Sequence, residues 1–231
     1  MAQMDDSVAG SGYGSPYLDA LIWGCRWARE PDNLTGPLQI AVHFGMPGED
    51  LPGYAQSWDA REMNAFRAAL QLYENVANIE FVETGNYDDA DMVEWVVPQS
   101  FFTAFYSPTT LGVHEVPDPS ETIAPPYGYF NTTDSSWADL SQGSFGFITV
   151  IHELGHALGL AHPHDGGDPV DEPDATVFPG VTPGIASDTG NYGLNQGIWT
   201  TMTYNDGWSQ VPSMTEAPVK VRFSRLASPS T

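Results

Sequence analysis

The chain has 231 residues, 41% of them hydrophobic, which is enough apolar side chain to bury one large core or two small ones. Thirty acidic residues against seven basic ones give a net charge of -23, which argues against a nucleic-acid-binding surface and against an anchor on an anionic membrane. The single cysteine, Cys25, excludes an intrachain disulfide, and no apolar run is long enough to cross a membrane as a helix.

The pattern along the chain predicts a flexible segment over residues 1–16, one folded domain over 17–208 and a tail over 209–231. The domain is expected to have an upper part that ends near residue 159 and a lower, irregular part after it. Short runs rich in β-branched and aromatic residues, each bounded by turn residues, predict strands at 38–44, 79–83, 91–97, 103–106 and 127–131.

Two helices are predicted from apolar side chains that recur every three or four residues. The first has Ser57 as its N-cap and an apolar stripe that faces a core. The members of this stripe are Met63, Phe66, Leu70, Tyr73 and Ala77. The second helix begins near Ser144 and ends at Gly159, a residue that can take the left-handed conformation that closes many helices.

The second helix carries the pattern H-E-x-x-H-x-x-G-x-x-H, in which His152 and His156 lie one helical turn apart. Both imidazoles therefore project from one face toward a single ion. A glycine turn at Gly159 lets the chain reverse, so that His162 can return as the third ligand. Three nitrogen ligands that leave a position open for water are typical of a catalytic Zn²⁺ site.

Glu153 follows the first histidine and can reach a metal-activated water without being a ligand itself. We interpret it as the general base that takes the proton of the water and then gives it to a leaving amine. A structural zinc site is closed and commonly contains several cysteines, whereas this chain has one. The motif therefore indicates a catalytic rather than a structural zinc site.

Residues 152–163 resemble the active-site motif of the metzincin zinc metalloendopeptidases, and the pair His162-Pro163 resembles their serralysin branch more than their matrixin branch. The resemblance extends over most of residues 13–208, with its clearest segments at 17–24, 75–81 and 144–149. It is a resemblance to the serralysin catalytic domain alone, because no Gly/Asp-rich calcium-binding repeats occur.

The resemblance implies further site residues. Thr201-Met202-Thr203-Tyr204 matches the methionine turn of the family, in which Met202 would support the zinc histidines from below. Tyr204 would be an additional zinc ligand that swings away to stabilise the reaction intermediate. The alternatives are that Met202 only fills a core and that Tyr204 is an ordinary aromatic residue.

The resemblance also implies an α+β fold, with a twisted mixed sheet, two long helices above the cleft and an irregular C-terminal subdomain. A protein or peptide substrate would bind in extended form along an edge strand, which we expect within residues 103–115. The expected enzyme is a secreted, extracellular monomer that binds neither nucleic acid nor a membrane. Two alternatives remain open: a non-catalytic, zinc-loaded binding module, and a latent protease that needs N-terminal processing.

Other polar residues near the motif have more ordinary interpretations. His164 follows a complete ligand set and is expected to be an exposed loop histidine. His43 and His114 have no partner at a metal-ligand spacing, and we expect them to be structural. The acidic residues at 88–91 and 165–174 could bind Ca²⁺, but neither run matches the calcium-loop pattern, and solvated carboxylates are favoured.

Overall fold

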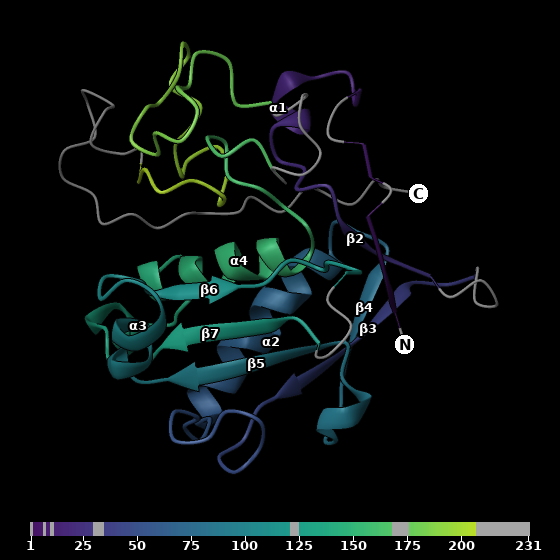
Figure 1. Ribbon diagram of the computed structural model, residues 1–231, viewed down its shortest axis with the longest axis vertical. Helices are drawn as coiled ribbons and strands as arrows, with labels where there is room; N and C mark the ends of the chain where they lie inside the picture. Colours follow the sequence, from purple (N-terminus) through teal and green to yellow (C-terminus); the bar gives the residue numbers. More distant parts are fainter. Residues whose placement is uncertain are drawn as a thin grey trace, which may run out of the picture.

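The structure is a computed structural model that describes residues 2–6, 8–9, 12–29, 35–120, 125–167 and 176–206. Figure 1 shows two parts, a sheet with its helices and an irregular segment that lies alongside one edge of the sheet. The segment 209–231, predicted to be a tail, lies outside the described residues. Within the described part of the chain, no helix is long and apolar enough to span a membrane.

The main sheet has five strands in the order β4-β3-β5-β7-β6. Their bounds are β3 (Leu38–Phe44), β4 (Ile79–Glu83), β5 (Met92–Val97), β6 (Gly112–His114) and β7 (Tyr127–Asn131). Strands β3, β4, β5 and β7 are parallel, and β6 pairs antiparallel with β7 at one edge. Four of the five predicted strands are confirmed, and the edge strand lies within the range expected for it.

The predicted strand at 103–106 is wrong, because Thr103 lies in the helix α3 (Gln99–Phe105). Aromatic and β-branched side chains favoured a strand locally, but their spacing suits a helix. The ring of Phe101 contacts Phe105, and the ring of Phe102 contacts Tyr106, each four residues on. Phe101 and Phe102 are buried against the sheet, so packing overrides the local preference of the side chains.

The first long helix, α2 (Ala60–Glu74), begins two residues later than predicted, with Asp59 rather than Ser57 as its N-cap. Asp59 Oδ1 accepts a hydrogen bond from the Glu62 backbone N–H, and the Glu62 side chain accepts one from the Asp59 backbone, each at 2.8 Å. This reciprocal capping box satisfies two backbone donors, whereas a helix capped by Ser57 would have alanine at the position of Glu62. Ala77 lies beyond the end of the helix.

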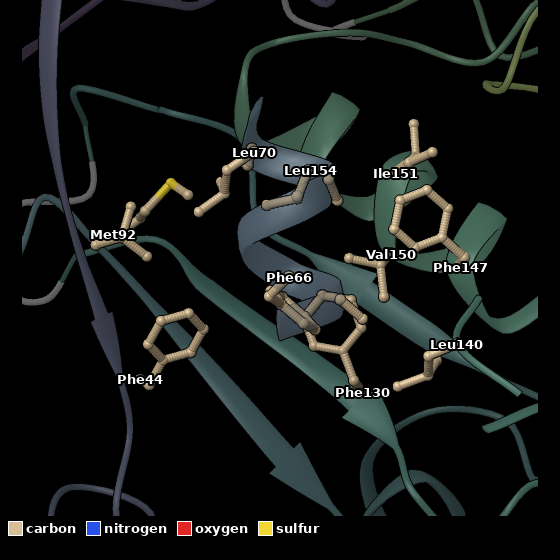
Figure 2. Close-up of a cluster of buried hydrophobic side chains, with 14 of the residues drawn as sticks. Phe44, Phe66, Leu70, Met92, Phe130, Leu140, Phe147, Val150, Ile151 and Leu154 are labelled. Atoms are coloured by element: carbon tan, nitrogen blue, oxygen red, sulfur yellow. The ribbon is translucent and has the colours of Figure 1, made fainter. Parts of the chain in front are cut away.

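The core lies between the sheet and a layer formed by α2 and α4 (Phe145–Ala157). Figure 2 shows Phe66 of α2 against Phe130 of β7, with Val150 and Leu154 of α4 beside them. The rings of Phe66 and Phe130 meet edge to face, with centroids 4.6 Å apart, and both residues are fully buried. Burial of each such side chain contributes about 1.5–3 kcal/mol, so this layer fixes α4 on the sheet.

Helix α4 begins after the N-cap Ser144 and closes at Gly159, as predicted. Gly159 has φ +88°, and its N–H donates to the His156 carbonyl at 2.9 Å, while the Leu160 N–H donates to the Gly155 carbonyl at 2.9 Å. This pair of bonds is a Schellman motif, which requires the left-handed conformation at Gly159. The chain therefore reverses immediately after the helix.

The N-terminal part packs against this reversal. It contains β1 (Gln3–Asp5), α1 (Pro16–Asp19) and β2 (Arg26–Ala28), and β1 lies within the segment that we expected to be flexible. Backbone bonds join Trp23 N–H to Gly159 and Ala161 N–H to Leu21, each at 3.0 Å. Cys25, within the same segment, is buried. The segment thus holds the chain where it leaves α4.

Short 3-10 helices lie at η1 (Tyr87–Asp89) and η2 (Ser135–Ala138). After α4, the described residues 158–167 and 176–206 form turns and bends without a helix or strand, which agrees with the expected irregular subdomain. A buried cluster of Ala20, Phe178 and Val181 connects this part to the N-terminal segment.

The reversal at Gly159 leads to a stability prediction. A Cβ at this position would overlap the Cys25 carbonyl oxygen, whereas Gly53 has a similar φ of +85° and nothing within 4 Å of a Cβ. Urea denaturation should show that Gly53→Ala costs roughly 1 kcal/mol from backbone strain alone. Gly159→Ala should cost about 3 kcal/mol or more, because strain and overlap combine. Equal losses in the two variants would contradict the proposed close approach.

Candidate active site and metal centre

The two sides of the candidate site come from α4 and from the chain that follows it. His152, Glu153 and His156 lie on α4 and are buried, and His162 lies just past the reversal at Gly159. The structure therefore brings together all three histidines that the sequence predicts as ligands. Among the described residues, this is the one group of three or more acidic, histidine or cysteine side chains arranged to hold a metal ion.

The three Nε2 atoms form a nearly equilateral triangle. They lie 3.3 Å apart between His152 and His156, 3.1 Å between His152 and His162, and 3.0 Å between His156 and His162. A tetrahedral zinc with Zn–N bonds of about 2.0–2.1 Å has ligand atoms about 3.3–3.4 Å apart. The triangle is therefore the right size for three corners of such a tetrahedron.

The opposite ring nitrogen of each histidine faces an oxygen atom that can only accept. His152 Nδ1 lies 2.6 Å from the Thr201 carbonyl, and His156 Nδ1 lies 2.8 Å from the Leu160 carbonyl. His162 Nδ1 lies 2.5 Å from a carboxylate oxygen of Asp165. Each Nδ1 therefore carries the proton, and three unprotonated Nε2 lone pairs face one another. Such an arrangement is repulsive without a cation between the nitrogens, so the donor set fits a metal ion.

Asp165 is a site residue that the sequence interpretation missed. It was treated as one of several loop carboxylates, yet it accepts from the ring of His162 and, at 3.3 Å, from its backbone N–H. Its position three residues after His162, a proposed ligand, is the sequence feature from which this role could have been predicted. Orientation of a ligand by a neighbouring carboxylate is common in metal sites, since it fixes the tautomer.

Burial keeps two of the ligands neutral. It lowers the pKa of His152 to about 4 and the pKa of His156 to about 3, in each case with a smaller contribution from His162. At pH 7 both imidazoles are therefore in the uncharged form that binds a metal ion. Helix α4 therefore places both imidazoles at the site in the protonation state that metal binding requires.

Glu153 is buried beside β6, the edge strand of the sheet. A Cβ at Gly112 would lie 2.8 Å from Glu153 Cγ, so glycine allows the strand to approach this side chain closely. Burial raises the pKa of Glu153 to about 8, and the His114 imidazole and backbone partly oppose this shift. A carboxylate with a raised pKa in a cleft is suited to accept and return a proton near neutral pH.

Met202 and Tyr204 occupy the positions expected from the methionine-turn resemblance. Met202 is buried directly beneath α4, and its Sδ would be overlapped by a Cβ at Gly155. The Tyr204 ring is largely exposed, with its centroid 5.4 Å from that of His152 and 4.6 Å from that of His162. The structure thus places a thioether below the histidines and a phenol beside them.

A cleft of about 540 Å³ opens over these residues. Its walls include Gly112 and His114 from β6, Glu153 and His156 from α4, and Tyr204. The cleft therefore lies between the edge strand of the sheet and the helix, where an extended chain can reach both.

The structure also tests the predictions made for the other histidines and for the two acidic runs. The prediction of an exposed His164 is wrong: the residue is buried, and its ring lies 5.1 Å from that of His162. The Gly184 N–H donates to the His164 carbonyl, so a later part of the chain packs against this residue. His43 and His114 are structural in that both are buried and hydrogen-bonded. The acidic run at 88–91 belongs to no potential metal group, and most of the run at 165–174 lies outside the described residues.

The lowered pKa of His156 leads to a prediction for the metal-free protein. At pH 7 the residue is neutral in both states, whereas at pH 5 only the unfolded chain takes up a proton there. Lowering the pH from 7 to 5 should therefore destabilise the wild-type protein by about 2 kcal/mol relative to His156→Gln. Urea denaturation of both proteins in chelator at the two pH values measures this difference. A pH-independent difference would contradict the lowered pKa.

Comparison with known proteins agrees with this geometry. A sequence profile of the Matrixin family, peptidase M10, matches residues 51–169, just over half of the chain. The serralysin of Photorhabdus luminescens is 26% identical over 147 residues, which cover 61% of this chain and 28% of the relative. The serralysin of Photorhabdus laumondii is 27% identical over 151 residues, which cover 61% and 29%.

The chain spans less than a third of the length of these curated relatives. The profile match includes α2, α4, the edge strand and all three histidines of the site. The match covers both long helices, four of the five strands of the main sheet and the histidine cluster, and it extends over more than half of the chain: the chain belongs to the Matrixin family of M10 peptidases.

Proposed function

We propose that this protein is a zinc-dependent endopeptidase that hydrolyses peptide bonds of proteins. One observation carries the proposal: three unprotonated Nε2 atoms converge beside a buried glutamate in a cleft that is edged by a strand. Membership of the M10 peptidases and the likeness to serralysins support a metallopeptidase activity of the EC 3.4.24 type.

His152, His156 and His162 would hold the ion, with Tyr204 beside them as an additional ligand in the resting enzyme. When bound there, zinc would supply Lewis-acid chemistry, polarising a carbonyl and lowering the pKa of a water to about 7. Asp165 and the carbonyls of Thr201 and Leu160 would keep the three rings in the binding tautomer. Met202 supports the ligand helix from below.

Glu153 is proposed as the general base. Its side chain is buried next to the histidine cluster yet lines the cleft, so it can accept a proton from water that attacks the scissile carbonyl. The same carboxyl would then donate the proton to the leaving amine, which balances the hydrolysis. The Tyr204 phenol, which lies beside the histidine cluster, would donate a hydrogen bond to the developing oxyanion.

The substrate is proposed to bind as an extended peptide along β6. This strand is last in the order of the sheet, and among the residues that the structure describes it pairs with β7 alone, which leaves its other edge available. An extended chain can add to such an edge through backbone hydrogen bonds, independently of its sequence. This geometry suits an enzyme that acts on proteins or peptides.

We also propose a secreted, extracellular monomer whose protease domain covers residues 17–208. The likeness to serralysins supports the location, and the net charge of -23 is compatible with a soluble surface in salt. The upper part would end near residue 159, where α4 closes, and the lower part would carry His162 and the methionine turn.

The role of Glu153 can be separated from metal binding. Glu153→Ala should retain one zinc per chain and lose peptide cleavage by at least about 10²-fold, because a positioned general base contributes that much or more. His156→Ala should lose both zinc and cleavage, since a ligand is removed. Metal analysis and cleavage of a quenched peptide measure both quantities. Undiminished cleavage by Glu153→Ala would refute the mechanism.

Dependence on the metal ion separates an enzyme from a zinc-loaded binding module. Casein or a quenched peptide should be cleaved by the protein, and a chelator should abolish the cleavage until zinc is returned. A matched sample with calcium returned instead of zinc controls for a structural effect of divalent ions. Zinc-loaded, folded protein that shows no chelator-sensitive cleavage over days would favour the binding module.

A further inference from the structure

A buried acid and a buried histidine meet under the active site across three strands. Glu94 of β5 and His114 of β6 are both in register with Gly128 of β7, which lies between them. Both side chains are fully buried, and Glu94 Oε1 lies 3.1 Å from His114 Nε2. Neither residue belongs to the proposed metal site.

Gly128 makes this contact possible. A Cβ there would overlap Glu94 Oε2 and lie 2.6 Å from His114 Cδ2. Strands two positions apart in a sheet are separated by about 9–10 Å, so side chains on them meet only where the middle strand has none in the way. The glycine thus allows β5 to be tied directly to the edge strand.

The hydrogen bonds indicate a charged pair. His114 Nδ1 lies 2.6 Å from the Glu115 carbonyl, which can only accept, and Nε2 faces the Glu94 carboxylate. Nδ1 must donate, and with Glu94 ionised Nε2 donates as well, as in an imidazolium. Burial alone lowers the pKa of His114, but Glu94, the hydrogen bond to the Glu115 carbonyl and, to a smaller extent, Glu153 on α4 together outweigh it and leave the pKa raised.

The pair lies on the face of the sheet that carries the chemistry. His114 and Gly112 are two residues apart on β6 and share a face, and Gly112 is the residue that approaches Glu153. Both also line the cleft. Because β6 has three residues and, within the described part of the chain, one neighbouring strand, an anchor at His114 controls where this short strand lies relative to α4.

We propose that Glu94 and His114 form a charged lock that positions the edge strand for peptide binding and holds its backbone against Glu153. They are positioning residues, because they act through β6 and Glu153. The inference rests on the proposed function for its effect on catalysis, whereas the lock itself is a property of the fold.

His43 supplies a matched control on the same sheet. It is buried, its Nδ1 lies 2.9 Å from the Thr84 carbonyl, and its Nε2 lies 3.0 Å from the Glu49 carboxylate. The hydrogen-bond pattern repeats that of His114, although the Glu49 side chain is 29% exposed, and His43 does not line the cleft. His43→Gln therefore measures the cost of losing a buried, carboxylate-bonded histidine away from the site.

Amide hydrogen exchange tests the lock without any need for activity. In Glu94→Gln, which keeps the shape of the side chain, and in His114→Gln, residues 112–115 should exchange at least about tenfold faster than in wild-type protein. In His43→Gln these residues should keep the wild-type rate. Unchanged exchange at 112–115 in both site variants, with the fold intact, would overturn the lock.

Kinetics of the zinc-loaded proteins test the positioning role. Glu94→Gln and His114→Gln should retain zinc and lose about 10–100-fold in kcat/KM, whereas His43→Gln should stay within about twofold of wild type. The double variant Glu94→Gln/His114→Gln should lose less than the product of the single losses, because the two residues act as one unit.

Hydrogen exchange and kcat/KM together distinguish the lock, its positioning role and the proposed peptidase function. Faster exchange with kcat/KM unchanged would overturn the positioning role while leaving the lock, and an equal loss in His43→Gln would show only general destabilisation. If the zinc-loaded wild-type protein cleaves no peptide, the proposed function fails, and the exchange experiment still decides whether the lock exists.

Discussion

Three unprotonated ring nitrogens that face one another are the constraint on which the rest of this structure depends. They repel unless a cation lies between them, so each must be held by its other nitrogen and by the chain around it. Helix α4 supplies two of them, and the Schellman turn at Gly159 returns the third. The N-terminal segment then pairs with the turn, and the Thr201 carbonyl holds His152 from the far side.

Helix α4 lies between the apolar core and the cleft of the candidate site. One face of α4 packs into the apolar layer around Phe66 and Phe130, which fixes its position on the sheet. Its other face carries His152, Glu153 and His156 into the cleft, where burial shifts all three pKa values toward the neutral forms. A rigid attachment on one side thus permits polar groups to be held with little water on the other.

A buried acid–histidine pair spans the sheet from β5 to the edge strand β6. The opposite charges of Glu94 and His114 compensate each other. Such compensation is required because neither side chain is accessible to solvent. Their cost in desolvation is offset by the partner charge and by the fixed hydrogen bond to the Glu115 carbonyl. Placement of such a pair beside Glu153 links the strand that borders the cleft to the centre of the sheet.

Local patterns predicted much of the fold and site, and their failures have physical causes. The helix with its histidines, its end at Gly159 and four of the strands follow from periodicity and from turn chemistry. The strand expected at 103–106 became α3 because its aromatic rings pack on the sheet at helical spacing. The N-cap at Asp59 depends on a reciprocal bond with Glu62, for which Ser57 has no equivalent partner.

The sequence by itself determined the metal-binding pattern, since His152, Glu153 and His156 lie within one turn of helix and Gly159 sets the direction of the chain after it. These are short-range properties, because helical geometry and left-handed φ act between neighbouring residues. Only the tertiary structure decided that His164 is buried, that Asp165 orients His162, and that Glu94 meets His114 over Gly128. Those contacts depend on chain reversal and on strand order, and no local pattern specifies which distant strands become neighbours.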